Sequence, residues 1–230
     1  MSQDYERAES ASGTNPLNTD SAKAWEELIE SVGPAGLLVV IERRMSASLR
    51  RRLAAEDLLQ ETLMHAWRDR KAVQWRGLRS FRAWLLTIAD NRIRDAATRE
   101  SALKRGGDSP AIAFSAMPPE SHSDPGIPSA DALVDSATPS WIAAHKEHAG
   151  AIREALDRVP AELRDVIYLR LLEQHSAEET AARLGITPSA VRYRLRKGTE
   201  IYRNYLRAAI GSRTRATIPS SEAGADSAPS

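Results

Sequence analysis

A stretch rich in proline, glycine, serine and aspartate divides the chain into two parts. Residues 106–140 contain Gly106, Gly107, Pro110, Pro118, Pro119, Pro125, Pro128 and Pro139. Proline removes a helical hydrogen bond and clashes with the preceding turn, so a helix cannot continue through this stretch. Its composition is typical of a linker. We therefore expect two separately folded segments.

Both flanking segments show helical periodicity, residues 22–104 before the linker and 141–210 after it. No stretch alternates with the period of a strand, which predicts an all-α fold made of two small helical domains. Hydrophobic residues make up 42% of the 230, enough for two modest helical cores. The expected divisions are a disordered N-terminal extension (1–20), a first domain (21–105), a linker (106–146), a second domain (147–210) and a disordered tail (211–230).

Charge and cysteine content exclude several classes of protein. The chain carries 32 Lys and Arg against 31 Asp and Glu, so its net charge of +1 does not indicate a nucleic-acid partner. The basic residues nevertheless cluster in residues 43–52, 76–105 and 192–207. Absence of cysteine excludes disulfides and thiolate metal sites. The polar N-terminus and the short apolar run at residues 36–41 predict a cytoplasmic protein without a membrane segment.

Residues 56–70 have the pattern of an amphipathic helix. The apolar positions are Leu59, Leu63, Ala66 and Trp67, and the opposite face carries Asp57, Gln60, Glu61 and His65. On the pattern alone, that polar face is an ordinary solvated surface.

A basic loop containing Trp75 follows, and Ser80 is expected to cap the next helix. That helix has apolar residues at Phe81, Trp84, Leu85, Ile88, Ala89 and Ile93 and polar ones at Arg82, Asn91, Arg92, Arg94 and Arg99. Aromatic rings stack on unpaired bases, amides bind base edges and guanidinium groups neutralise phosphates, so the combination suits melted DNA. The alternative is that Trp75 fills the core, as we expect for Trp84.

The second segment contains a helix-turn-helix pattern. Residues 162–173 are expected to form a helix with Leu163, Val166, Ile167 and Leu171 inward. Ser176 and Glu179 have the spacing of a capping box, and Gly185 supplies the positive φ of the turn. Thr187 then caps a helix whose first position is Pro188.

The second helix of this motif presents Ser189, Arg192, Tyr193, Arg194, Arg196 and Lys197. Arginine can bind both major-groove acceptors of guanine, and lysine binds phosphate, so this pattern favours a DNA-reading helix. A helical hairpin with a solvated basic face is the alternative.

Four segments resemble the extracytoplasmic-function sigma factors of bacterial RNA polymerase. Residues 57–63 (DLLQETL) and 81–91 (FRAWLLTIADN) are similar to region two of that family, and residues 156–164 (LDRVPAELR) and 178–185 (EETAARLG) to region four. The two blocks occur in the family's order with a linker between them.

The resemblance implies a role for each block. Asp57, Gln60 and Glu61 would bind core RNA polymerase. Trp75, Ile88 and Asn91, with Arg92 beside them, would melt the minus-ten promoter element and hold a flipped base. The recognition-helix residues named above would read the minus-thirty-five element. Promoter DNA and core polymerase are thus the expected partners, an anti-sigma factor is a further candidate, and no cofactor, metal or small-molecule substrate is expected.

Two positions depart from the family pattern. Asp90 stands where a neutral or basic residue is frequent, and its carboxylate would repel phosphate. Gly198 lies inside the recognition helix, where glycine costs about 1 kcal/mol relative to alanine.

Other functions fit the sequence less well. A duplex-binding regulator that works without core polymerase would explain the helix-turn-helix but not the first domain, and an inactive sigma-like protein that sequesters a regulator stays open. The chain has no Gly-rich phosphate loop and no Cys nucleophile, which argues against an enzyme. His145 and His148 could share a helical face, but they lack a third metal ligand nearby and are expected to be solvated.

Overall fold

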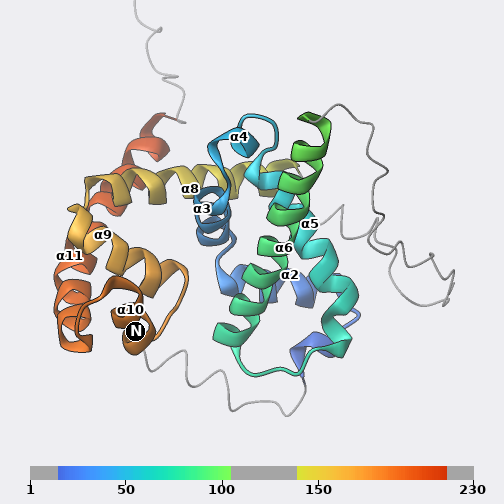
Figure 1. Cartoon of the computed structure of the whole chain (residues 1–230), viewed down its shortest axis with the longest axis horizontal. Coiled ribbons are helices and arrows are strands. Elements are labelled where there is room, and N and C mark those ends of the chain that lie inside the picture. The colour runs from blue at the N-terminus through green and yellow to red at the C-terminus, as the bar shows by residue number, and fades with distance from the viewer. Residues whose placement is uncertain (1–14, 105–138, 217–230) are drawn as a thin grey trace, which may run out of the picture. The chain divides into compact units, whose positions relative to one another are not determined.

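The computed structural model describes residues 15–104 and 139–216, and every regular element in them is a helix (Figure 1). The all-α prediction is thus confirmed for these residues. They form two units: the first runs to Ala149 and also includes Leu172–Gln174, and the second comprises Gly150–Leu171 and the chain from His175. The predicted disordered ends and linker fall, for their greater part, outside the described residues.

Three element boundaries differ from those expected from the sequence. The 3-10 helix η2 (Pro16–Asn18) lies inside the predicted extension because Leu17 is buried and Asn15 caps the turn. Helix α8 (Pro139–Arg158) begins within the predicted linker, where proline at its first position is compatible with a helix. Helix α11 (Pro188–Ala216) continues into the predicted tail.

The first unit is built around an apolar central helix, α3 (Pro34–Arg44), in which residues 37–41 are all buried. The helices around it are α2 (Ala22–Val32), α4 (Ala47–Arg50), α5 (Ala55–Asp69), α6 (Leu78–Lys104) and the first part of α8, with the 3-10 turn η3 (Arg70–Ala72) after α5. Trp25 packs edge-on against both Trp67 and Phe81, with ring centroids 5.3 and 5.9 Å apart. These aromatic contacts join α2, α5 and α6.

The start of α6 differs from the prediction that Ser80 caps it. The helix begins at Leu78, and Ser80 lies exposed in its first turn. Gly77 has a φ of 88°, and its carbonyl accepts the Phe81 N–H at 3.0 Å. The left-handed glycine therefore turns the chain into the helix earlier than the serine suggested.

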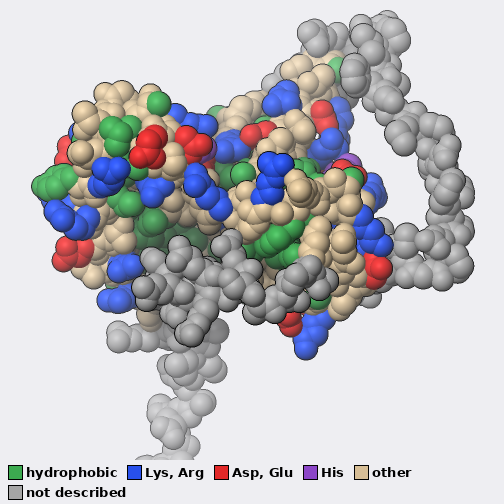
Figure 2. All heavy atoms as spheres, turned by 90° about the horizontal axis from the view of Figure 1, so that it is seen from below, with side chains coloured by type: hydrophobic (Ala, Val, Ile, Leu, Met, Phe, Trp, Pro, Cys, Tyr) green, Lys and Arg blue, Asp and Glu red, His purple; other side chains and the backbone are tan. Residues whose placement is uncertain are grey.

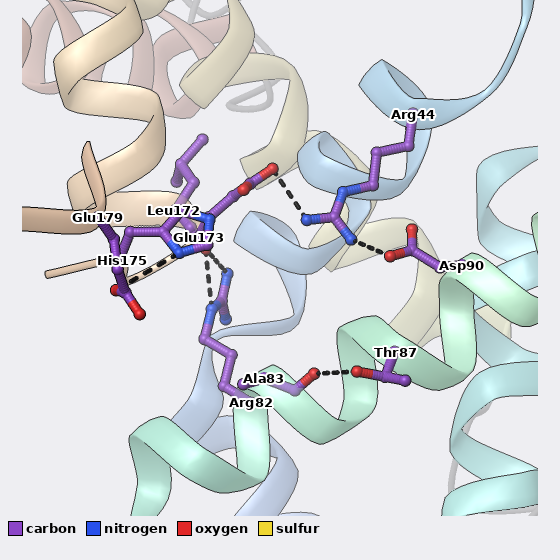
Figure 3. Close-up of polar contacts among 9 residues, drawn as sticks. All are labelled: Arg44, Arg82, Ala83, Thr87, Asp90, Leu172, Glu173, His175 and Glu179. Carbon is purple, nitrogen blue, oxygen red and sulfur yellow. Dashed lines mark hydrogen bonds and ion pairs between the residues drawn. The ribbon is translucent and has the colours of Figure 1, made fainter. Parts of the chain in front are cut away.

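Arg82, expected on the polar side of α6, is instead buried with 3% of its surface exposed. Its guanidinium donates to the carbonyls of Val32 and Gly33 at the α2–α3 turn. It also donates to the Leu172 carbonyl at 2.8 and 2.9 Å (Figure 3). A buried guanidinium must satisfy its donors, and these backbone oxygens do so. Arg82 is therefore a structural residue of the first unit and is not available to phosphates.

The second unit contains the predicted helix-turn-helix. It consists of the rest of α8, α9 (Ala161–Ile167), a π-helical turn η4 (Tyr168–Leu172), α10 (Ala177–Leu184) and α11. The Ser176 hydroxyl accepts the Glu179 N–H at 3.0 Å, and the Glu179 carboxylate accepts the Ser176 N–H, which completes the capping box. Gly185 ends α10 with a φ of 65°, and Thr187 caps α11 by accepting the Ala190 N–H at 3.2 Å.

Three buried side chains hold the helix-turn-helix against α9: Val166, Ala181 and Val191. Leu171, expected to point inward, is 38% exposed. The reason is the π-helical turn, because its wider spacing shifts the register of all residues that follow α9.

Gly198 is buried where α11 crosses α9. A Cβ atom at this position would lie 3.1 Å from Ile167 Cγ1 and 3.2 Å from Leu163 Cβ. The glycine thus permits close packing of the two helices, which explains its presence inside the recognition helix.

Candidate nucleic-acid interface

The exposed side of the recognition helix α11 carries five of the six predicted residues. Ser189, Arg192, Tyr193, Arg196 and Lys197 are all exposed, and their spacing of three and four residues places them on one helical face. The opposite side holds buried Val191 and Gly198. Arg194 is half-buried and lies away from that face. The structure therefore brings five predicted residues together and separates the sixth.

Two of these side chains have weak partners within the second unit. Arg192 Nη2 lies 3.6 Å from Glu178 Oε1, and both side chains are about two-thirds exposed. The Arg196 guanidinium lies 6.0 Å from the centre of the Tyr193 ring. Exposed ion pairs of this kind contribute about 0–1 kcal/mol. DNA phosphates or base acceptors could therefore replace them at little cost.

One edge of α6 forms a second candidate surface, in the first unit. Ile88 is half-buried and Asn91 is exposed one turn later. Trp75, in the loop before α6, is half-buried, and its ring centroid lies 5.9 Å from that of Phe81. Trp75 therefore contacts the core and is also partly accessible. The sequence had offered base stacking and core filling as alternatives, and this position combines features of both.

Trp84 lies on the same edge, although the sequence placed it in the core. It is half-buried, three residues from Phe81 and four from Ile88, and its ring centroid is 5.8 Å from that of Phe81. The sequence did contain a sign of this partial exposure, since Trp84 stands at the boundary between the apolar and polar stripes of the helix. A side chain at such a boundary is partly buried rather than enclosed.

Arg92 is tied to its neighbours rather than extended into solvent. Its Nη1 lies 3.1 Å from His65 Nε2, and its Nη2 lies 2.9 Å from Asp95 Oδ2. Arginine can only donate, so Nε2 must be the unprotonated, accepting nitrogen of His65. Burial and the positive charges of Arg92 and Arg68 lower the pKa of His65, which agrees with a neutral ring.

Asn91 also has an intramolecular partner. Its side-chain oxygen accepts a hydrogen bond from Arg94 Nη1 at 2.9 Å, in an exposed position. The amide nitrogen can donate to a base edge without disturbing this contact. Arg94 thereby orients the amide.

Asp90 does not face the edge formed by Ile88 and Asn91. Its Oδ2 lies 2.8 Å from Arg44 Nη1 on α3, and Arg44 Nη2 also lies 3.0 Å from Glu173 Oε1 (Figure 3). Burial opposes the charged form of Arg44, but the carboxylates of Glu173 and Asp90 outweigh it and raise the pKa. The charge of Asp90 is therefore compensated by Arg44 on another side of α6, which weakens the expected repulsion of phosphate.

The polar face of α5 carries the residues expected to bind polymerase. Asp57 is exposed, and Gln60 and Glu61 are half-buried. The opposite, buried stripe consists of Leu58, Leu59, Thr62, Ala66 and Trp67. The Thr62 hydroxyl donates to the Leu58 carbonyl at 2.6 Å, so a polar residue fits this stripe.

The structure changes the interpretation of the two histidines of α8. His145 is 9% exposed, and its Nε2 lies 2.8 Å from Glu30 Oε1, so it is not solvated as expected. His148 is exposed. Across the described part of the chain, no three His, Asp or Glu side chains gather as a metal site. Within residues 15–104 and 139–216, no helix combines the length and apolar character that crossing a bilayer requires.

Comparison with known proteins identifies both units. Residues 36–102 match Sigma-70 region 2, and residues 149–199 match Sigma-70, region 4. The chain is 31% identical to the RNA polymerase sigma factor CarQ of Myxococcus xanthus over 183 residues, which cover 80% of this chain and 89% of that protein. The chain belongs to the extracytoplasmic-function sigma factors.

Two further relatives support the same family. The ECF RNA polymerase sigma factor SigD of Mycobacterium tuberculosis is 28% identical over 74% of this chain and 70% of its own length. The probable RNA polymerase sigma factor RfaY of Xanthomonas campestris is 27% identical over 72% of this chain, and the match spans 37% of the RfaY sequence. No solved structure matches the chain.

Membership of the family places this sigma factor in transcription initiation and implies RNA polymerase and promoter DNA as partners. Figure 2 shows Lys and Arg side chains scattered among acidic and hydrophobic ones on the face that it presents. With a net charge of +1, DNA affinity depends on local groups of basic residues.

Proposed function

We propose that this sigma factor binds core RNA polymerase through α5, opens the minus-ten element with the edge of α6 and reads the minus-thirty-five element with α11. The observation that carries the proposal is the five-residue face of α11. Its residues are exposed on a helix whose opposite side is buried, and they follow a complete capping box and a left-handed glycine turn. Helix-turn-helix proteins insert such a face into the major groove.

Arg192 and Arg196 are suited to read guanine, because a guanidinium can bind both N7 and O6 of that base. Tyr193, 56% exposed, can contact a thymine methyl group or the sugar-phosphate backbone. Lys197 stands at the end of the face, where a flexible ammonium binds phosphate. This division predicts that arginine changes alter sequence preference and that lysine changes alter affinity for all sequences.

The edge of α6 is suited to melted DNA. A base that leaves the duplex loses stacking, and an accessible aromatic ring restores part of it. Trp75 and Trp84 provide two such rings, each in contact with Phe81. Asn91 provides an amide that can bind a base edge. Arg92 contributes positive charge beside them while His65 and Asp95 fix its side chain.

We assign the polymerase contact to Asp57, Gln60 and Glu61, and their place in the region that matches Sigma-70 region 2 supports this assignment. Asp57 and Glu61 are one turn apart on α5, so their carboxylates can face a basic surface together. Asp57 is exposed and Glu61 is half-buried, opposite the buried stripe of the helix, which supports a role in binding a partner.

A reconstituted system of purified core polymerase, this sigma factor and a promoter library tests the proposal. We expect transcription that depends on the sigma factor and selects promoters with two conserved elements. Asp57→Lys should abolish assembly with core polymerase, whereas Lys197→Glu should leave assembly intact and weaken promoter binding. Failure of the unaltered chain to bind core polymerase, with retained binding to duplex DNA, would establish the duplex-binding regulator instead.

A further inference from the structure

The first part of α8 lies against the side of α5 that adjoins the proposed polymerase contacts. One groove is lined by Trp141, Ile142 and His145 of α8, by Glu56, Leu59, Gln60 and Leu63 of α5, and by Leu38 of α3. All of these residues belong to the first unit. The groove is therefore a property of that unit by itself.

The α5 residues of the groove form one helical face. Glu56, Leu59, Gln60 and Leu63 follow a spacing of three and four residues. Asp57 and Glu61, each next in sequence to a groove residue, lie on the adjoining face, and Gln60 belongs to both. A helix or loop of another protein that binds Asp57 and Glu61 would therefore also meet this groove.

The α8 residues form a complementary face. Trp141, Ile142, His145 and Ala149 are buried or half-buried, whereas Ala143, Ala144, Glu147 and His148 are exposed. The two sets alternate with the period of a helix, so α8 presents one side to the first unit. Trp141 and Ile142 supply the apolar surface that faces Leu59 and Leu63 across the groove.

Three polar contacts hold this part of α8. Trp141 Nε1 donates to Glu30 Oε1 at 2.7 Å, and His145 Nε2 lies 2.8 Å from the same oxygen. Lys146 Nζ lies 3.0 Å from Glu56 Oε1, and the lysine side chain is 64% exposed. The ion pair of Lys146 is largely exposed and contributes little to stability, whereas His145 is buried. The Lys146 contact can therefore be lost at little cost, and a partner that displaces α8 must replace its apolar surface and the contact of His145.

We propose that residues 141–146 of α8 are an intramolecular cover of the polymerase-binding side of α5, and that core RNA polymerase displaces them. The proposal rests on the assignment of α5 as the polymerase contact. When a site is uncovered in only a fraction of the molecules, its apparent affinity is the intrinsic affinity multiplied by that fraction. Weakening the cover should therefore strengthen polymerase binding.

The cover can be tested in the full-length protein without polymerase. Since the chain has no cysteine, Gln60→Cys introduces a single thiol into the groove. We expect its alkylation by a small thiol reagent to become several-fold faster when Trp141→Ala or Lys146→Glu is added. Ala144→Glu, on the exposed side of α8, is the matched control and should leave the rate unchanged. Equal alkylation rates in all these proteins would overturn the cover.

A charge swap tests whether the ion pair itself holds the cover. Adding Glu56→Lys to Lys146→Glu restores an ion pair of opposite orientation between α5 and α8. In the Gln60→Cys background, this double change should restore the slow alkylation of the introduced thiol. Alkylation that stays as fast as with Lys146→Glu alone would show that the ion pair does not hold the cover.

Binding to purified core polymerase tests the consequence of the cover. Trp141→Ala and Lys146→Glu, in the chain without cysteine, should bind about 3- to 10-fold more tightly than the unaltered chain. Ala144→Glu should bind like the unaltered chain.

The outcomes separate the cover from the function on which it rests. If the unaltered chain binds core polymerase and the α8 variants bind equally well, the cover is overturned and the proposed function stands. If no variant binds core polymerase, the proposed function fails, and the role of the cover fails with it.

Discussion

Gly198 of α11 and Leu163 of α9 approach so closely that a Cβ atom on the glycine would lie 3.2 Å from the leucine Cβ. The leucine Cβ is fixed to the backbone of α9, so it cannot move aside as the end of a flexible side chain can. Gly198 lowers the local helix propensity of α11, but it also allows α11 to pack closely against α9.

Gly198→Ala should consequently destabilise the second unit. Alanine gains about 1 kcal/mol of helix propensity, but overpacking of a close-packed contact costs about 1–3 kcal/mol. We expect a lower midpoint of urea unfolding, followed by helical circular dichroism. Gly211→Ala, on the same helix with no atom near its added Cβ, is the control and should raise the midpoint. An equal rise for both variants would contradict the packing argument.

The recognition face predicts different effects for two basic residues of α11. Lys197→Ala should weaken promoter binding by the polymerase holoenzyme and lower the dependence of log affinity on log salt concentration by about one unit, because one phosphate contact is lost. Arg194→Ala should change both much less, since Arg194 is half-buried off the face. Fluorescence anisotropy with labelled promoter DNA at several salt concentrations measures both quantities. A larger effect for Arg194 would place the DNA on another side of α11.

The edge of α6 predicts a defect that depends on the state of the DNA. Trp75→Ala and Asn91→Ala should impair open-complex formation on duplex promoters more than on promoters with a pre-melted bubble, because capture of an extruded base supports melting. Permanganate footprinting and initial transcription from the two templates give the comparison. Ser101→Ala, an exposed change about three turns beyond Asn91 on α6, is the control. Equal defects on both templates would exclude base capture.

The contact between His65 and Arg92 predicts a pH dependence of stability. Burial and the neighbouring arginines lower the pKa of His65 below its usual value near 6.5 in the folded protein. The unfolded state therefore binds a proton more readily, so this contribution to stability is complete above about pH 6.5 and is lost as the pH falls through the folded-state pKa. His65→Gln should reduce the loss of stability on acidification, measured by urea unfolding between about pH 5 and 8.

A His65→Gln profile that coincides with that of the unaltered chain would show that folding does not lower the pKa of His65.

Local patterns of sequence determined much of this protein. Helical periodicity indicated the all-α class, and the Ser176–Glu179 box, Gly185 and Thr187 defined the helix-turn-helix to within its capping hydrogen bonds. These features could be predicted because each depends on residues only a few positions apart. The same reasoning identified the exposed face of α11, apart from Arg194.

Contacts between distant residues decided the rest. The burial of Arg82 depends on carbonyls 49 or more positions away, and Asp90 is compensated by Arg44, 46 positions away. Gly198 was unfavourable by helix propensity and became explicable only through its contact with α9. Sequence periodicity tells which side of a helix is apolar, but not which neighbour that side meets. Only tertiary packing therefore decided which charged groups are compensated within the protein and which remain exposed for polymerase and DNA.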